Sequence, residues 1–441
     1  MYSYRKIGQV SLPIILGLLA QNVIQITDTI LMGRVGEAEF GATGLAGIYY
    51  IAFFMLAFGF SIGCQILISR RNGEKKYEAI GGIVIHSILF LIVLAAILYF
   101  ASAFITRNYL PRFIKSPEIS EAAISYLDWR TIGFFFSFIN VIFRAFYVGI
   151  IRTSVLTLNA IVMALVNFFA AYGLIFGNLG LPQMGIAGAG LASVIAEASS
   201  ILFFIFHTYA TIDLKKYGFR IKRFDFSIIR KVFHISVFTM IQYFASLATW
   251  FLFFMAIENH GERDLAITNI IRTFYMIFFI PMNALSTTAN TLVSNTIGEG
   301  RAKEVLPLVY RISKMNLVIV LIMAIIAAIA PEFWISFIVS KGDISLISET
   351  VKPLYVLLFA LPICSIATVM FNSVSGTGNT QIGLLFELST LVVYVMALWF
   401  IVIHLHSSVA ICWTVEYIYW GILMILSFIY LKWGNWQKKQ I

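Results

Sequence analysis

Residues 68–81 read ISRRNGEKKYEAIG, and residues 292–305 read LVSNTIGEGRAKEV. The dipeptide Gly-Glu stands at 73–74 in the first stretch and at 298–299 in the second, an offset of 225 positions. Long apolar runs flank both stretches. This pattern predicts a duplicated unit in which a short polar loop joins two apolar helices.

The same offset extends along the chain on both sides of the loops. It pairs Ser11 with Ser236 and Gly36 with Gly261, without a gap over more than sixty residues. If each half holds an even number of spanning helices, the repeats enter the membrane in the same orientation and are related by a pseudo-twofold axis along its normal. We expect two bundles that rock about a central cleft, as alternating access requires.

The composition excludes an ordinary soluble protein. Of 441 residues, 60% are apolar and only 12% are charged, whereas soluble chains carry roughly 25% charged residues. The basic residues lie between apolar runs and not on one solvated face, which argues against nucleic-acid binding. The three cysteines have no CxxC or Cys/His spacing, so neither a disulfide framework nor a zinc site is expected. No catalytic constellation is present, and we predict neither an enzyme nor a cofactor.

A spanning helix needs about 20 mostly apolar residues. Twelve segments meet this requirement, and we therefore predict an all-α polytopic membrane protein with twelve transmembrane helices in two six-helix lobes. The expected spans are 7–33, 43–69, 80–104, 122–149, 154–177, 185–210, 230–257, 266–294, 308–334, 350–375, 381–404 and 407–431.

The lysines and arginines predict the orientation and the domain boundaries. With the amino terminus in the cytoplasm, 21 of the 31 basic residues are cytoplasmic, eight are outside and two remain in helices, as the positive-inside rule favours. We expect a lobe at 1–211, a basic cytoplasmic linker at 212–229 and a lobe at 230–441. Both termini would face the cytoplasm, and the expected location is a plasma membrane, most simply a bacterial cytoplasmic membrane.

Several stretches, in order, match a known family. Residues 21–36 (QNVIQITDTILMGRVG), 171–193 (AYGLIFGNLGLPQMGIAGAGLAS) and 375–383 (SGTGNTQIG), together with the two loops quoted above, resemble the multidrug and toxic compound extrusion (MATE) family. The resemblance implies an exporter that exchanges inward H⁺ or Na⁺ for an outgoing small amphipathic, often cationic, compound. The expected partners are that compound and the lipid bilayer, and the chain is expected to be a monomer.

Asp28 is the foremost candidate for ion coupling on physical grounds. It stands in a long apolar run, where an aspartate costs roughly 2.5–3.5 kcal/mol on insertion scales and persists mainly at a bundle interior or a water path. Protonation of such a carboxyl depends on its surroundings. An aspartate that only bonds a neighbouring helix is the alternative.

The resemblance adds Asn167 and Ser193 to this site, and Glu197 is a second acidic residue at membrane depth in the same half. Asn167 and Ser193 stand where family members often have Asp or Asn and Thr, and Glu197 follows on the same segment as Ser193. Met163 occupies a place where an Asn is frequent, so Glu197 is expected either to compensate for the missing oxygen or to be a structural carboxyl. H⁺ is the expected ion, with Na⁺ at Asp28 as the alternative and no other metal.

Other residues of the first segment are candidates for substrate contact or movement. Gln21 and Gln25 share that segment with Asp28 and are candidate substrate or gating residues. Pro13 removes a backbone hydrogen bond from the same helix and predicts a kink. The resemblance implies a helix that bends when Asp28 is protonated, and a static kink is the alternative.

The carboxyl half departs from the NorM branch of the family. Ser246 and Cys364 stand where that branch has two carboxylates, which argues against a Na⁺ site in this half. Arg272, Glu387 and Glu416 are its membrane-depth charges and candidate substrate or gating residues. Because a buried Arg rarely stays unpaired in lipid, we expect Arg272 to pair with one of the two glutamates.

Two other functions remain open. A lipid-linked oligosaccharide flippase of the same superfamily would need several cations in its cleft, and only Arg144 and Arg272 are assigned to membrane depth. A membrane-embedded enzyme or receptor would leave the repeat unexplained. Both are less favoured than the exporter.

Overall fold

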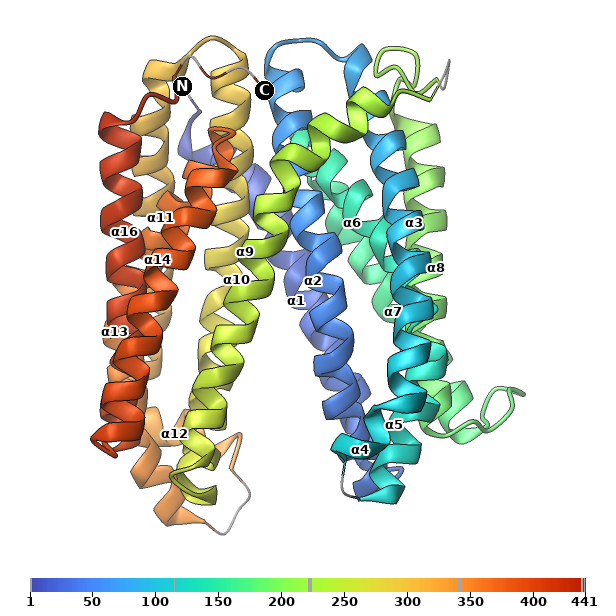
Figure 1. Ribbon diagram of the computed structural model, residues 1–441, viewed down its shortest axis with the longest axis vertical. Helices are drawn as coiled ribbons and strands as arrows, with labels where there is room; N and C mark the ends of the chain where they lie inside the picture. Colours follow the sequence, from blue (N-terminus) through green and yellow to red (C-terminus); the bar gives the residue numbers. More distant parts are fainter. Residues whose placement is uncertain (1, 115, 221–223, 340–342, 438, 440) are drawn as a thin grey trace. The chain divides into compact units, whose positions relative to one another are not determined.

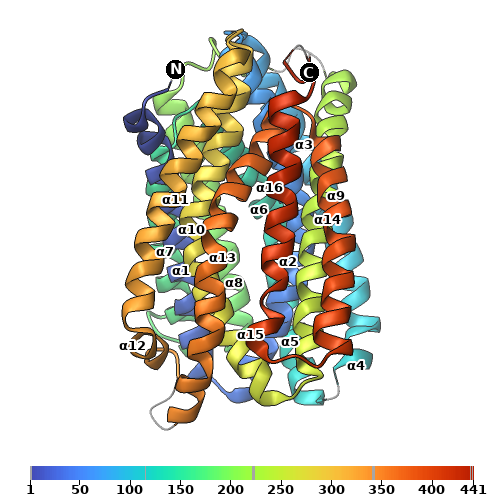
Figure 2. The ribbon, with the colours of Figure 1, turned by 90° about the vertical axis from the view of Figure 1, so that its left-hand side faces the viewer.

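The computed structural model describes residues 2–114, 116–220, 224–339, 343–437, 439 and 441. Regular structure in these residues is entirely helical (Figures 1 and 2). Among them, eleven helices are long and apolar enough to cross a membrane, and one bent pair of helices brings the number to twelve. The predicted all-α polytopic class is confirmed. Residues 221–223 of the predicted linker lie outside the described part of the chain.

The chain forms two compact units, Leu12–Met240 and Met1–Ser11 with Ile241–Ile441, which we call the amino-terminal and carboxyl-terminal units. Their boundaries fall inside α1 (Tyr4–Gly33) and α9 (Phe226–Glu258), and the boundaries predicted at 212–229 stay a prediction. The other helices of the amino-terminal unit are α2 (Glu37–Gly73), α3 (Glu78–Asn108), α4 (Leu110–Phe113), α5 (Pro117–Arg130), α6 (Gly133–Gly149), α7 (Ser154–Phe176) and α8 (Ile186–Thr211). Those of the carboxyl-terminal unit are α10 (Glu262–Gly298), η1 (Ala302–Glu304), α11 (Val305–Ile329), α12 (Pro331–Ser336), α13 (Ile344–Gly376), α14 (Thr380–Leu398), η2 (Trp399–His404), α15 (Val409–Cys412) and α16 (Val415–Trp433).

The sequence repeat is also a structural repeat. α2 and α10 each contain 37 residues, and both their first and last residues are separated by the predicted offset. The turn that follows each helix has the same backbone shape, because Lys75 (φ 58°) and Gly300 (φ 75°) both adopt the left-handed conformation. Glycine adopts this conformation without steric cost, and other residues seldom do.

Small residues allow α9 to pack closely on α2 within the amino-terminal unit. A Cβ atom on Gly63 would lie 2.7 Å from the Cα of Ser236, and one on Gly59 would lie 2.6 Å from the Cα of Met240. The Ser236 hydroxyl donates a hydrogen bond to the carbonyl of Phe60 at 3.0 Å. Glycines four residues apart permit such backbone approach in membrane helices.

The fourth predicted span, 122–149, is not a single straight helix. Its residues belong to α5 and α6, whose axes differ by 52°. The break falls after Arg130 and before Gly133, at the place where α5 and α6 contact α8. This bend positions the arginine described next.

Candidate functional site

The amino-terminal unit contains a buried ion pair at the bend between α5 and α6. Arg130, the last residue of α5, donates two hydrogen bonds to Glu197 on α8: Nη2 to Oε1 at 2.7 Å and Nη1 to Oε2 at 3.1 Å. The two side chains are only 12% and 9% exposed. A planar guanidinium matches a carboxylate in this two-point arrangement, which fixes orientation as well as charge.

Aromatic and hydroxyl groups surround this ion pair. The Arg130 guanidinium lies over the Tyr50 ring, 3.6 Å from its centroid. The Tyr50 hydroxyl donates to Ser137 at 2.9 Å and lies 3.4 Å from Glu197 Oε1. Asn140 donates to the backbone carbonyl of Glu197 at 3.0 Å. Several elements therefore hold Arg130 and Glu197 in place.

Asp28 on α1 lies close enough to interact with Arg130 and with the Asn167 amide on α7. Its side chain is half-buried. Its Oδ1 atom is shielded from solvent and completes no hydrogen bond, and the same holds for both amide atoms of Asn167. The site thus contains a carboxyl oxygen without a hydrogen bond beside the Asn167 amide, and an incoming proton or cation could bind to this oxygen.

The other predicted site residues of this unit lie on α8 and α1. Ser193 is half-buried one turn before Glu197 and makes no hydrogen bond to Asp28 within the described residues. Gln21 and Gln25 are exposed. α1 is continuous through Pro13, whose carbonyl accepts a hydrogen bond from the Thr157 hydroxyl at 3.0 Å.

Arg130 is a residue of the candidate site that the sequence prediction missed, because the positive-inside count places it among the eight basic residues outside. The sequence does contain an indication that Arg130 is buried, since Arg130 lies inside the predicted span 122–149. An arginine within an apolar span calls for a carboxylate partner. Glu197 was expected near Asp28, and the structure instead engages its carboxylate with Arg130.

Gly133 provides space for the ion pair. A Cβ atom at this position would lie 2.3 Å from Arg130 Nη1 and 2.6 Å from Glu197 Oε2. We expect Gly133→Ala to displace the pair and lower the free energy of unfolding by about 1–3 kcal/mol, the usual cost of overpacking. Thermal unfolding in detergent measures this. Gly47→Ala is the control, because nothing lies within 4 Å of its added Cβ; equal losses in both variants would contradict the steric explanation.

The carboxyl-terminal unit contains two buried carboxyls that are held by neutral donors. Glu387 on α14 accepts hydrogen bonds from the hydroxyls of Ser246 and, at 2.7 Å, Tyr419. Glu416 on α16 accepts from the Tyr275 hydroxyl and from the indole of Trp420, both at 3.0 Å. Ser246, at a position where the resemblance implied a carboxylate, thus contacts a carboxyl that another helix supplies.

The predicted pairing of Arg272 with Glu387 or Glu416 is wrong for the described residues. Neither glutamate forms a salt bridge there. Arg272 is half-buried, and its guanidinium lies 5.3 Å from the centroid of the Phe254 ring. Hydroxyl and indole donors bond to both carboxyls, and Oε2 of Glu387 is buried without a hydrogen bond. In the described residues, neutral donors and not a cation hold these glutamates.

No group of three or more His, Cys, Asp or Glu side chains suited to a metal ion occurs in the described part of the chain.

Comparison with known proteins identifies the fold. The MatE family model matches residues 13–173 and 236–401. The chain belongs to the MATE family of transporters.

Individual MATE relatives support this assignment. A probable multidrug resistance protein NorM of Agrobacterium fabrum is 25% identical over 328 residues, 73% of this chain and 70% of that protein. A NorM of Pasteurella multocida is also 25% identical, over 74% of this chain and 69% of its own length. A solved multidrug resistance MATE transporter in an outward-facing conformation shares the fold, with a TM-score of 0.87 and 16% identity over 99% of this chain and 96% of its own. This MATE chain is therefore a transporter and not an enzyme.

Proposed function

We propose that this MATE transporter exports a small amphipathic, often cationic, compound from the cytoplasm in exchange for an inward H⁺, with Asp28 as the coupling carboxyl. The observation that carries the proposal is the unsatisfied Asp28 carboxyl next to Asn167 and the Arg130–Glu197 pair. The multidrug resistance names of the NorM relatives support the substrate class.

The charges of the cluster explain how a proton and a cation would compete. Arg130 and Glu197 cancel each other, so the net charge of the cluster depends on Asp28 alone. An ionised Asp28 leaves one negative charge that attracts a cationic compound, and protonation removes it. Proton entry from outside would therefore release the compound, and proton loss to the cytoplasm would restore the site.

Asp28 suits coupling better than the two glutamates of the carboxyl-terminal unit. Glu387 and Glu416 are 0% and 4% exposed, and protein hydroxyl and indole groups bond to them. A proton or substrate must reach a coupling group from water during each cycle. Asp28 is half-buried and therefore more accessible than either glutamate, although its Oδ1 atom is shielded.

Export into everted membrane vesicles tests the proposal. A fluorescent lipophilic cation should accumulate in vesicles with an acidic interior only when the transporter is present. An imposed Na⁺ gradient at uniform pH should drive no accumulation. If Na⁺ alone drives uptake, the proton is the wrong coupling ion; if neither gradient drives uptake of any cationic or neutral amphipathic compound, the export function itself is wrong.

A flippase for lipid-linked oligosaccharides is the less favoured function. It would need free cations at membrane depth to receive a pyrophosphate. Arg130 adds a third arginine to Arg144 and Arg272, but Glu197 neutralises it. The exporter therefore remains the better proposal.

The proposed orientation places both termini and the loop after α2 in the cytoplasm. All three native cysteines are buried, so an introduced cysteine can be labelled selectively. We expect a membrane-impermeant maleimide added to intact cells to label Leu179→Cys, in the exposed turn between α7 and α8, and to spare Lys75→Cys. The reverse pattern would contradict the orientation.

A further inference from the structure

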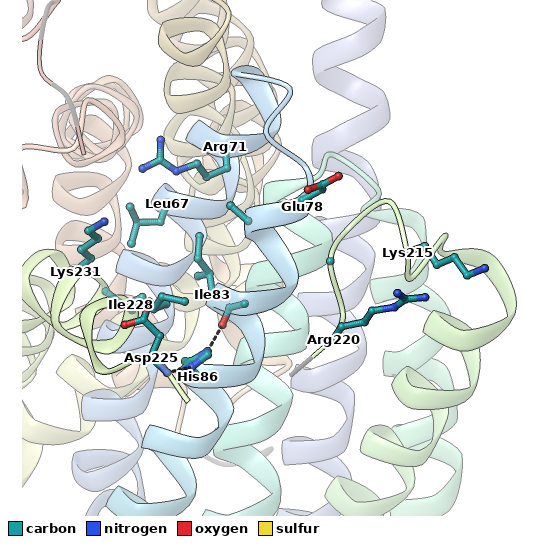
Figure 3. A pocket seen from close by; sticks show the side chains of 14 residues that line it. Leu67, Arg71, Glu78, Ile83, His86, Lys215, Arg220, Asp225, Ile228 and Lys231 are labelled. Atoms are coloured by element: carbon teal, nitrogen blue, oxygen red, sulfur yellow. Dashed lines mark hydrogen bonds between the residues drawn. The ribbon is translucent and has the colours of Figure 1, made fainter. Parts of the chain in front are cut away.

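A cavity of about 550 Å³ lies in the amino-terminal unit, away from Asp28. Its walls come from the end of α2, the first turns of α3, the connection after α8 and the start of α9 (Figure 3). It opens at the end of the unit where the loop between α2 and α3 lies, which is the end proposed to be cytoplasmic. No part of the proposed export cycle uses it.

Basic side chains dominate the lining. Arg71 of α2, Lys215 and Arg220 of the connection, and Lys231 of α9 all line the cavity, and in Figure 3 Lys231 and Lys215 lie at opposite ends of this group. Glu78 and Asp225 are the acidic residues of the lining. Four cations and two anions line the cavity, and when Glu74, which pairs with Arg71, is included the net charge is +1, which favours an anionic ligand.

Two of these cations have no acidic partner among the described residues. Arg71 forms a salt bridge with Glu74 at 2.6 Å, and Lys231 interacts electrostatically with Asp225. Lys215 and Arg220 form no salt bridge within the described residues. Lys215, Arg220 and Lys231 all belong to the stretch 215–231, and the fold brings this stretch to Arg71 of α2.

The hydrogen bonds of Asp225 explain its place in the lining without a bound cation. Its carboxylate accepts a hydrogen bond from the backbone N–H of Ser227 at 2.8 Å, and hydrogen bonds from Ser227 lower the pKa of Asp225. Its own backbone N–H donates to Nε2 of the buried His86 at 2.9 Å, while Nδ1 of that ring bonds the carbonyl of Gly82. These bonds attach the start of α9 to α3 and fix one wall of the cavity.

The remaining lining is apolar, with Leu67, Ile83, Ile228 and Val232 contributed by three transmembrane helices. We propose that this cavity binds the phosphate group of an anionic ligand, with an anionic phospholipid of the inner leaflet as the expected source. Lysine and arginine would contact the phosphate, and the aliphatic wall would receive the adjoining part of an acyl chain. Basic cavities between helices at the cytoplasmic surface suit anionic head groups.

Matched variants can separate a defined site from diffuse surface charge. The site variant combines Lys215→Gln, Arg220→Gln and Lys231→Gln. The control combines Lys75→Gln, Arg230→Gln and Lys303→Gln, which removes the same charge at positions that do not line the cavity. All six side chains are exposed, so both variants should fold, and their thermal unfolding should match that of the wild type.

Binding is measured on the purified full-length protein in detergent by native mass spectrometry. The probes are dioleoyl phosphatidylglycerol, dioleoyl phosphatidylcholine, and inorganic phosphate as a competitor. Phosphatidylglycerol should bind in preference to phosphatidylcholine. At about fivefold per basic residue near a membrane surface, the site variant should lose roughly one hundredfold in affinity, and the control should change by less than about threefold.

Competition with phosphate identifies the source of the ligand. Competition only at high millimolar phosphate supports a phospholipid, and displacement by phosphate as strong as that by the lipid supports a phosphate site for a soluble anion. Equal loss of affinity in the site and control variants, or unchanged affinity in both, would overturn the proposal. None of these results depends on whether the protein exports a cation.

Discussion

Export by Asp28→Asn is expected to lose its dependence on the pH gradient. The asparagine side chain is neutral at every pH, so it cannot carry the proton whose movement drives the cycle. A pH difference of one unit supplies about 1.4 kcal/mol per proton, enough for roughly a tenfold gradient of a monovalent cation exchanged one for one with the proton. In everted vesicles with an acidic interior, the compound should therefore accumulate up to this ratio with the wild type and should not accumulate with Asp28→Asn. Uptake of a fluorescent neutral or cationic compound measures the change.

Glu387→Gln is the matched control for this experiment. It makes the same chemical change at a carboxyl that is completely buried and bonded to Ser246 and Tyr419. We expect it to retain gradient-driven export. Unimpaired export by Asp28→Asn would reject Asp28 as the coupling group, and loss of export only in Glu387→Gln would assign coupling to the other unit.

The second large effect is expected on stability. Glu197→Gln leaves the Arg130 charge without its carboxylate partner in a site that is almost closed to solvent. Removal of one partner from a buried ion pair costs about 3–5 kcal/mol, because the remaining charge is desolvated and unpaired. The variant should unfold at a markedly lower temperature in detergent than the wild type.

A double-mutant cycle separates the pair from its surroundings. Replacement of both residues, Arg130→Met with Glu197→Gln, removes the unpaired charge and should cost less than the sum of the two single changes. Arg107→Gln is the control, since Arg107 and its partner Asp128 are both exposed and such pairs contribute about 0–1 kcal/mol. Additive losses in the double variant would indicate that Arg130 and Glu197 act independently.

The fold was largely predictable, because the features that determine it can be read from the sequence itself. The thickness of a bilayer fixes how long an apolar run must be, and the recurring Gly-Glu loops mark the ends of α2 and α10. The bend between α5 and α6 was not predicted. No proline stands at the break, and the bend depends on packing against α8 and on the space that Gly133 provides.

The candidate site was only partly predictable, because partners depend on tertiary structure. Asp28 and Asn167 were predicted, and the structure places them together. The partner of Glu197 could not be read from spacing, since Arg130 is 67 positions away on another helix. The sequence prediction paired Glu387 and Glu416 only with a charged residue. Neutral hydroxyl groups can also donate hydrogen bonds to a buried carboxyl.

The unit boundaries inside α1 and α9 impose an order on biosynthesis. The amino-terminal unit ends at Met240, so all its residues have been synthesised when the ribosome has little more than half of the chain complete. The carboxyl-terminal unit also includes the first eleven residues. Their partners come much later, since the Tyr2 hydroxyl donates to Glu299 and the Tyr2 carbonyl accepts from Arg311. Residues 2–11 can therefore reach these partners only after the second half of the chain has been synthesised.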